Sequence, residues 1–378
     1  MKCKLSDICG FRKGKVDVSN LTLKTYISTE NMLPNKGGIT VASSLPTVQL
    51  TQEYKKGDVL VSNIRPYFKK IWQAKCDGGC SNDVLVFQGN SNIDGDFLYY
   101  ILANDDFFAY SMATSKGTKM PRGDKTSIMQ YEVPLIDLQV QKKIASVLKV
   151  LDEKIELNNE INNNLGQQME ALYKSWFIDF EPFKGAKPEN WSKTDIYSIA
   201  DIIYGAPFSS KLFNTDGIGK PIIRIRDLKN QEFVTYTTEE HLKGHLIQPG
   251  DIIVGMDGEF RPYIWGNESA WLNQRVCIFE NKRPKGKAFV FFTIKPLLNV
   301  IEQTQVATTV IHIGKKDYDA FEITLPDKTS LDRFDEITAP MIDQIVTNRL
   351  ENKRLATLRD ALLPKLMSGE LDVSNIDL

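Results

Sequence analysis

The chain repeats itself once, because segments of its first half recur in the same order in its second half. The matched segments are 155–177 with 345–367, 57–61 (GDVLV) with 250–254 (GDIIV), 65–67 (RPY) with 261–263, and 82–84 with 274–276. A chain of 378 residues that is duplicated nearly end to end is expected to form two similar units rather than one core.

Short runs of β-branched and aromatic residues, separated by Gly, Pro and Asn, fill much of each copy. Such runs are typical of β-strands. They occupy residues 58–61, 84–87, 222–226 and 276–279. Residues 97–110 have the pattern of short helices. We therefore expect an α+β fold for the globular part of each copy.

A heptad pattern begins at Leu138, where apolar positions start to recur in steps of four and three. In the first copy this seam comprises Ile144, Leu148, Leu151, Ile155, Asn158, Asn162, Leu165, Met169, Leu172 and Trp176. In the second copy it comprises Met341, Ile345, Asn348, Asn352, Leu355, Leu362 and Leu366, and Arg359 takes the seam position between Leu355 and Leu362. A helix of this length cannot bury such a stripe alone, so we expect the two helices to form an antiparallel coiled coil around a pseudo-twofold axis.

The seam carries asparagines at two equivalent positions of each helix, Asn158 and Asn162 in one and Asn348 and Asn352 in the other. Buried amides at such positions penalise wrong registers. The alternative is that they are exposed to solvent where the coil is thin.

The ends of both helices have recognisable signals. Pro182 and Gly185 are expected to stop the first helix. For the second, residues 329–332 resemble a capping box at its start, Gly369 suits its end, and Pro340 is expected to kink it. The predicted organisation is a globular domain at 1–136, a helix at 137–183, a second domain at 184–328, and a second helix with its tail at 329–378.

The charge of the chain is nearly balanced, with 47 basic and 48 acidic residues and a net charge of −1. This balance argues against a protein that coats nucleic acid non-specifically, so any contact with DNA must be local. Five cysteines without a framework spacing are expected to be reduced thiols, and we expect no structural zinc site. The start of the chain has no signal-like apolar run and no stretch has the length of a membrane helix, so we expect a cytoplasmic protein.

The sequence carries no recognisable motif of catalysis. A Gly-rich methyltransferase loop is missing, and residues 217–220 (GIGK) lack the Ser or Thr of a nucleotide-binding loop. Asp327, Glu351 and Lys353 superficially resemble a nuclease set, but the latter two fall on the heptad helix rather than on a sheet. The three histidines form no triad that the sequence can identify.

The duplication, the two helices, the run LRDALLPKLMSGEL at 358–371 and the stretch at 133–159 together resemble the specificity (S) subunit of type I restriction-modification systems. The junction YKSWFIDFEPF at 173–183 fits the same family. The resemblance implies two target-recognition domains that each read one half of a bipartite, asymmetric site in double-stranded DNA. It further implies that the helices dock two adenine-methylating modification subunits and, through them, the motor-nuclease restriction subunit.

The resemblance also implies that this chain is not itself an enzyme. S-adenosylmethionine, ATP and Mg²⁺ are expected in the partner subunits, and no catalytic residue, metal or cofactor is expected here. The alternatives are an assembly scaffold without DNA specificity, which predicts no salt-dependent DNA binding, and a stand-alone nuclease, which predicts metal-dependent cutting by this chain.

Contacts to DNA are expected from loop residues with cationic or amide side chains. They are Arg65, Lys116, Lys119 and Arg122 in the first domain, and Arg224, Arg226, Arg261, Gln274, Arg275, Lys315 and Lys316 in the second. Arg and Gln offer paired groups that match the guanine and adenine edges in the major groove. Alternatively, the two Arg-Pro-Tyr segments are turns that support the core.

Overall fold

The computed structural model describes residues 2–304 and 312–373. Its contacts divide the chain into two compact units, unit 1 (Met1–Glu153 and Ala356–Leu378) and unit 2 (Lys154–Leu355). Two long helices, α5 (Leu138–Phe177) and α8 (Lys328–Ser368), each contribute one segment to either unit.

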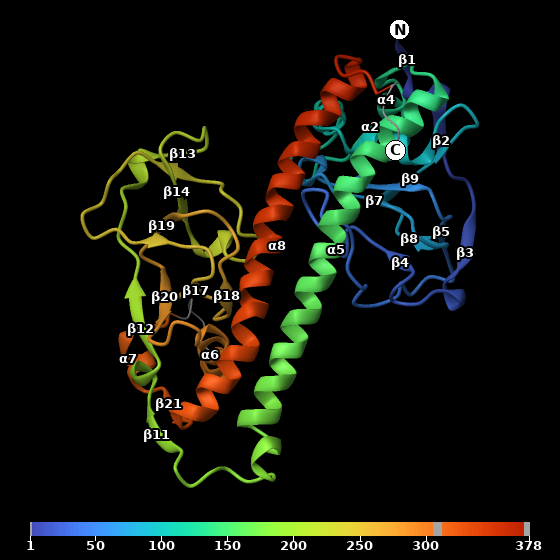
Figure 1. Ribbon diagram of the computed structural model, residues 1–378. Helices are drawn as coiled ribbons and strands as arrows, with labels where there is room; N and C mark the ends of the chain where they lie inside the picture. Colours follow the sequence, from blue (N-terminus) through green and yellow to red (C-terminus); the bar gives the residue numbers. More distant parts are fainter. Residues whose placement is uncertain (1, 305–311, 374–378) are drawn as a thin grey trace. The chain divides into compact units, whose positions relative to one another are not determined.

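Unit 1 contains two four-stranded sheets and a small strand pair (Figure 1). The first sheet has the order β2 (Cys9–Phe11), β9 (Val84–Gly89), β6 (Val59–Ser62), β7 (Ile71–Gln73). The second has the order β3 (Lys15–Asp17), β5 (Leu50–Tyr54), β8 (Gly78–Cys80), β4 (Tyr26–Ile27), and its last pair is parallel. The strand pair is β1 (Lys2–Lys4) with β10 (Glu132–Pro134), and the short helices are α1 (Leu5–Ile8), α2 (Gly95–Ala103), α3 (Asp105–Ala113) and α4 (Lys125–Ile128), with 3-10 turns η1 (Val18–Asn20) and η2 (Pro66–Phe68).

Unit 2 also contains two sheets and a small strand pair, but its second sheet has five strands. Its first sheet has the order β12 (Ala200–Tyr204), β20 (Val276–Asn281), β17 (Ile252–Gly255), β18 (Pro262–Ile264). The second has the order β13 (Phe213–Asn214), β15 (Tyr236–Thr237), β14 (Lys220–Ile223), β19 (Ala270–Leu272), β16 (Leu246–Ile247), with β14 and β19 parallel. The remaining elements are the pair β11 (Ser192–Asp195) and β21 (Glu322–Leu325), the helices α6 (Lys287–Thr304) and α7 (Lys315–Asp319), and the 3-10 turns η3 (Glu181–Phe183), η4 (Ile196–Ser198), η5 (Ser210–Leu212) and η6 (Ile225–Asp227).

The first sheet of each unit is buried on both faces. Because side chains alternate along a strand, Val59 and Val61 of β6 pack toward the helices while Leu60 packs toward the second sheet. In unit 2, Ile252 and Val254 pack toward the helices and Ile253 toward the second sheet. The same alternation in the same strand supports the predicted α+β duplication.

The duplication also reaches individual hydrogen bonds. The N–H of Gly57 donates to the carbonyl of Ala74 at 2.8 Å, and the N–H of Gly250 donates to the carbonyl of Trp265 at 2.7 Å. Both glycines have a left-handed backbone, with φ of 92° and 89°. Only glycine adopts this conformation without steric cost, so the Gly-Asp turn is retained in both copies.

One sequence match is wrong in space. In unit 1 Trp72 lies opposite Leu60, whereas in unit 2 Tyr263 lies opposite Ile253. Since Leu60 and Ile253 are equivalent, the counterpart of Tyr263 is Trp72 and not Tyr67. The two Arg-Pro-Tyr segments therefore differ in structure: the first forms η2 and the second enters β18. Three identical residues could not fix the register across a connection of different length.

The predicted strands at 58–61, 84–87 and 276–279 are confirmed, and residues 97–110 form two short helices as expected. The strand predicted at 222–226 is only partly correct, because it ends at Ile223. The N–H of Arg224 donates to the carboxylate of Asp227 at 3.0 Å, and the chain turns into η6 there.

The long helices begin and end close to the predicted positions. α5 starts at Leu138 as expected and ends at Phe177, before the proline and glycine that were expected to stop it. The cap of α8 is Asp327, whose carboxylate accepts from the N–H and hydroxyl of Ser330 at 3.0 and 2.7 Å, so the predicted capping box at 329–332 is wrong. α8 continues through Pro340 as one element, and Gly369 follows its end with φ of 76°.

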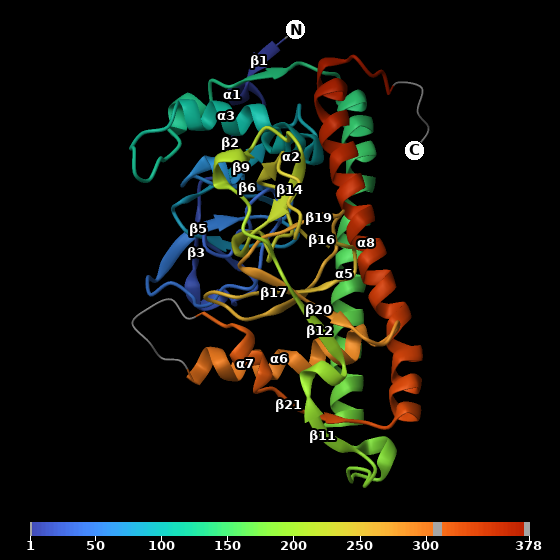
Figure 2. The ribbon, with the colours of Figure 1, turned by 90° about the vertical axis from the view of Figure 1, so that its left-hand side faces the viewer.

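The two helices lie side by side within each unit (Figures 1 and 2). In unit 2 the amide of Asn158 donates to Asn352 at 2.8 Å, and the amide of Asn348 donates to Asn162 at 2.9 Å. Residues advance along α5 as their partners recede along α8, so these helix segments run in opposite directions. Asn158 and Asn348 are 1% and 3% exposed, which excludes the solvent-exposed alternative for both.

Every residue of the predicted seam is buried or half-buried. In unit 1, Ile144 and Leu148 of α5 share a hydrophobic cluster with Leu363 and Leu366 of α8. Across the described residues, no helix combines the length and apolarity that a membrane span needs. Residues 374–378 of the predicted C-terminal tail lie outside the described part.

Candidate nucleic-acid interface

Three loops meet beside the first sheet of unit 1, and we call this place junction 1. They follow β6, precede β9 and precede α4. The N–H of Asn63 donates to the carbonyl of Asp83 at 2.8 Å, and the N–H of Gly123 donates to the carbonyl of Asn63 at 3.1 Å. Ile64 and Arg122 form an isolated β-bridge. The long connection after α3, which supplies the third loop, projects from the unit in Figure 2.

Unit 2 builds junction 2 with the same main-chain bonds. The N–H of Met256 donates to the carbonyl of Arg275 at 2.9 Å, and the N–H of Ile313 donates to the carbonyl of Met256 at 2.9 Å. Asp257 and His312 form the matching bridge. Arg275 therefore takes the place that Asp83 has in junction 1.

Junction 1 carries several basic side chains on its surface. Arg122 pairs with Asp83 at 3.2 Å, with side chains 55% and 37% exposed. Lys116 exchanges two main-chain hydrogen bonds with Arg122, each of 2.9 Å, and its amine donates to Asp124 at 2.7 Å. That hydrogen bond, followed by donors of Ser127, lowers the pKa of Asp124 to about 2.

The other two predicted DNA-contacting residues of unit 1 differ in environment. Lys119 is exposed at the tip of the same loop. Arg65 has a left-handed backbone, with φ of 50°, and its N–H donates to the carbonyl of Pro121 at 2.8 Å. Its Nε is buried without a hydrogen-bond partner among the described residues. The structure thus brings Arg65, Lys116 and Arg122 together at one junction.

Junction 2 has a different set of charges. The guanidinium of Arg275 lies 3.7 Å from the carboxylate of Asp257, which also contacts the His312 ring at 2.6 Å. Arg261 lies 3.8 Å from Glu259 in the adjoining loop, and both are exposed. The remaining predicted residues of this junction, Gln274, Lys315 and Lys316, are exposed.

Arg224 and Arg226 lie on a turn beside junction 2, where the N–H of Asn273 donates to the carbonyl of Ile223 at 3.3 Å. Arg226 is exposed. The guanidinium of Arg224 instead bonds to Asp227 at 3.4 Å and to Thr235. Its donors are thus engaged inside the unit.

Sequence reasoning missed the acidic and histidine members of the junctions, Asp83, Asp257 and His312. Cationic and amide side chains were the expected contacts, because DNA is an anion. The duplication held a signal for one of them, because the matched segments 82–84 and 274–276 place Asp83 opposite Arg275.

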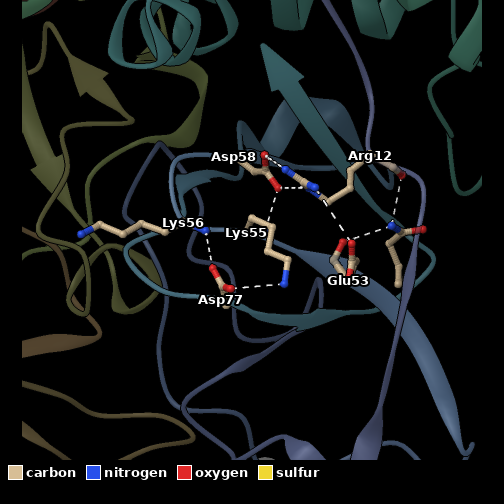
Figure 3. Close-up of polar contacts among 7 residues, drawn as sticks. Arg12, Glu53, Lys55, Lys56, Asp58 and Asp77 are labelled. Atoms are coloured by element: carbon tan, nitrogen blue, oxygen red, sulfur yellow. Dashed lines mark hydrogen bonds and ion pairs between the residues drawn. The ribbon is translucent and has the colours of Figure 1, made fainter. Parts of the chain in front are cut away.

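A second charged cluster of unit 1 is self-neutralised (Figure 3). Arg12, which follows β2, donates to both carboxylate oxygens of Asp58, one of them at 2.9 Å. Lys55 lies 3.2 Å from Asp77, which also accepts from the N–H of Lys56 at 2.9 Å. The hydrogen bond to Asp58 raises the pKa of Arg12. The contacts of Arg12 and Asp77 hold the turn between β5 and β6 in place.

The residues considered for nuclease chemistry serve different structural contacts. Asp327 caps α8 and accepts from the indole of Trp191 at 2.9 Å. Glu351 accepts from Asn158 at 2.7 Å, and the Lys353 amine donates to Asn267 at 2.6 Å. Among the residues that the structure describes, no three potential metal ligands gather in one place.

Comparison with known proteins agrees with this architecture. The profile of the family described as "Type I restriction modification DNA specificity domain" matches residues 1–167 and 188–359, so it covers both copies. The chain therefore belongs to the type I restriction-modification DNA specificity family.

Three relatives cover nearly all of the chain. The type I restriction enzyme HindI specificity subunit of Haemophilus influenzae is 24% identical and is matched over 97% of this chain and 98% of its own length. The type I restriction enzyme MjaIX specificity subunit of Methanocaldococcus jannaschii is 26% identical, over 95% and 88%. The crystal structure of the type I restriction-modification system S subunit from M. genitalium has the same fold, with a TM-score of 0.56, 16% identity, and coverage of 99% and 96%.

Membership in this family makes the chain a non-catalytic specificity subunit. Catalysis in type I systems lies in the partner subunits.

Proposed function

We propose that each unit reads one half of a bipartite, asymmetric DNA site through its junction. The observation that carries this proposal is that the two junctions share their main-chain hydrogen bonds but present different charged side chains. The shared main-chain hydrogen bonds hold the loops of both units in the same conformation, and the different side chains at the two junctions would give the two units different base preferences.

Arg122 and Arg275 are the proposed central contacts. Each is about half exposed and lies beside one carboxylate, Asp83 or Asp257. The carboxylate orients the guanidinium before DNA arrives, and an oriented guanidinium can make a bidentate contact to guanine. Lys116, Lys119, Arg226, Arg261, Lys315 and Lys316 are proposed to contact phosphates, which adds affinity without base preference.

The two long helices are proposed to form an antiparallel coiled coil with a pseudo-twofold axis. Two hydrogen bonds between asparagine side chains support this arrangement, Asn158 with Asn352 and Asn348 with Asn162. The duplication relates Asn158 to Asn348 and Asn162 to Asn352, so each hydrogen bond is the counterpart of the other. The proposed recognition domains are residues 1–136 and 184–328, with the helical regions 137–183 and 329–378 between and after them. A rigid coil of this kind would set the readers about 34 Å apart, one turn of B-DNA.

The helices are also proposed to dock two modification subunits and, through them, the restriction subunit. In unit 2, Leu157 and Ile161 lie one turn apart on α5 and are 50% and 37% exposed. Leu358 of α8, in unit 1, is 48% exposed. Apolar side chains on the outer face of a paired helix suit a protein partner. S-adenosylmethionine, ATP and Mg²⁺ are proposed to bind those partners, and the complex to act in the cytoplasm.

The proposal is tested by sequencing N6-methyladenine in cells that carry this gene with its neighbours, before and after deletion of this gene alone. Loss of methylation at one bipartite motif supports the proposal and reveals the target. Methylation that persists unchanged at every motif contradicts it.

Substitutions separate the two half-sites. We expect Arg122→Ala to weaken DNA binding by about 1–3 kcal/mol, measured on the subunit assembled with its modification partners. It should relax base preference in one half-site only. Arg275→Ala should relax the other half-site. Lys193→Ala is the matched control, because it removes an exposed lysine of β11 that pairs with Glu322 of β21, and binding should stay unchanged.

A further inference from the structure

A cluster of three polar side chains interrupts the apolar packing between α5 and α8 in unit 1. The guanidinium of Arg359 on α8 donates to Asp152 on α5 at 2.6 Å, and the hydroxyl of Tyr100 on α2 donates to the same carboxylate at 2.8 Å. The side chains of Arg359 and Asp152 are 15% and 26% exposed, and Tyr100 is buried. We call Tyr100, Asp152 and Arg359 the charged triad.

The equivalent positions of unit 2 are apolar. Asp152 corresponds to Ile342, because the two precede the equivalent asparagines Asn158 and Asn348 by the same interval. Arg359 corresponds to Met169, because the two follow the equivalent asparagines Asn352 and Asn162 by the same interval. Tyr100 follows the buried Phe97 in α2 as Phe292 follows the buried Phe289 in α6. The counterparts Phe292, Ile342 and Met169 belong to one hydrophobic cluster of unit 2.

Side-chain size differs between the units as well. In unit 2, Phe334 of α8 packs against Phe177 and Trp176 of α5, with ring centroids 4.9 and 5.9 Å apart. The counterparts in unit 1 are aliphatic: Ile144 of α5 packs in one cluster with Met367 and Leu366 of α8. The two ends of the helix pair are therefore related by duplication but differ in both charge and shape.

We propose that the charged triad makes the first half of the chain pair with the second half and not with the first half of another copy. A pair of two first halves would place Asp152 beside Met169, so that a part-buried carboxylate would lose its cation. A pair of two second halves would place Arg359 beside Ile342 and Phe292, where it would keep only its ion pair with the neighbouring Asp360, at 2.9 Å. Of the three pairings, the unlike pair is the one that gives Asp152 a cation.

The selection is strong because the charges are largely buried. Removing one partner of a buried ion pair is far more costly than replacing both with apolar groups. The inference concerns assembly and goes beyond DNA reading, since it rests only on helix pairing. Its consequence is that like pairs, which would carry two identical junctions, are suppressed in favour of a subunit with two different ones.

The test follows which halves associate. A protease site is inserted between Ala186 and Lys187, in the exposed connection between the copies, and the folded full chain is cut there. Two preparations with different N-terminal tags are mixed, unfolded in urea and refolded by dilution. Capture of one tag and detection of the other measures pairs of two first halves, without any DNA, so failure here is distinguishable from failure of the proposed function.

For the native sequence we expect unlike pairs to dominate. The triple variant Y100F/D152I/R359M replaces the triad with apolar side chains, and we expect the ratio of like to unlike pairs to rise by roughly 100-fold. A ratio that stays at the native value in the folded triple variant overturns the proposal.

A second set of variants keeps the charges and does not depend on that repacking. Asp152→Arg alone places two guanidinium groups together and should reduce recovery of unlike pairs by at least about tenfold. Adding Arg359→Asp restores an opposite pair and should restore the unlike product. If the exchanged pair recovers nothing relative to the single variant, with helix content unchanged by circular dichroism, the proposal is refuted.

Discussion

The carboxylate of Asp327 caps the start of α8 and also contacts a tryptophan. It accepts hydrogen bonds from Ser330 at two atoms and from the Trp191 indole at 2.9 Å. We expect Asp327→Ala to lower the free energy of unfolding by about 1–3 kcal/mol, because it removes a helix cap and leaves a part-buried indole N–H unpaired. Urea unfolding followed by circular dichroism measures this change.

The matched control is Asp137→Ala, at the start of α5. Asp137 accepts from the N–H of Gln139 at 2.8 Å and, among the described residues, accepts no hydrogen bond from an indole. Its loss should cost less than the loss of Asp327. Equal costs for the two substitutions would show that the Trp191 contact adds nothing.

The effect of Asp327 depends on pH in a definite direction. The hydroxyl of Ser330, followed by backbone donors and Trp191, lowers the pKa of Asp327 below its ordinary value of 3.8. A depressed pKa gives stability that is complete above the unfolded-state pKa and is lost as pH falls through the folded-state pKa. The difference between native protein and Asp327→Asn should therefore be constant from about pH 5 to 7 and shrink below about pH 4.

At the scale of elements, the amide contacts between α5 and α8 couple the two helices. Asn158 donates to Asn352 and to Glu351, at 2.8 and 2.7 Å. We expect Asn158→Leu to destabilise unit 2 by about 1–3 kcal/mol, because it removes the donor of two part-buried hydrogen bonds. The double variant Asn158→Leu/Asn352→Leu should cost less than the sum of the single variants, by about 0.5–3 kcal/mol. Additive costs in a double-mutant cycle would contradict the coupling.

These helices were predictable from sequence because a heptad pattern is local and long. Its first residue, Leu138, coincides with the observed start of α5, and the seam residues are buried or half-buried. The cap of α8 was misplaced, since Asp327 and Ser330 both offer capping groups and only the fold decides between them. The false match of the Arg-Pro-Tyr segments failed for another reason: strand register depends on pairing with β6 or β17, which no three-residue identity contains.

At the scale of the whole molecule, the helix pair makes a prediction about the DNA target. One heptad inserted between Glu160 and Ile161 of α5, with a matching heptad between Arg349 and Leu350 of α8, keeps the seam in phase. It lengthens the pair by about 10 Å, at 1.5 Å per residue. We expect the unread spacer of the methylated motif to grow by about 3 base pairs, with both half-sites unchanged. If methylation sequencing finds the original spacer length in the active variant, the helices do not set the length of the DNA spacer.

The candidate site was predictable in part. Basic residues in loops were named from sequence, and Arg65, Lys116 and Arg122 meet at junction 1. The sequence could not show that Arg224 is held by Asp227 and Thr235, because these contacts arise from a turn that folds back on itself.

The main-chain bonds of the junctions have a consequence for how this protein changes over generations. A main-chain hydrogen bond survives replacement of the side chain on the same residue, so Ile64 and Asp257, or Arg122 and His312, occupy matching backbones. Mutation at such positions leaves the loops in place and changes the side chains that the proposed interface presents to DNA. Because each unit has its own junction, the proposed interface would let a lineage acquire a new half-site preference in one unit while the other retains its ancestral preference.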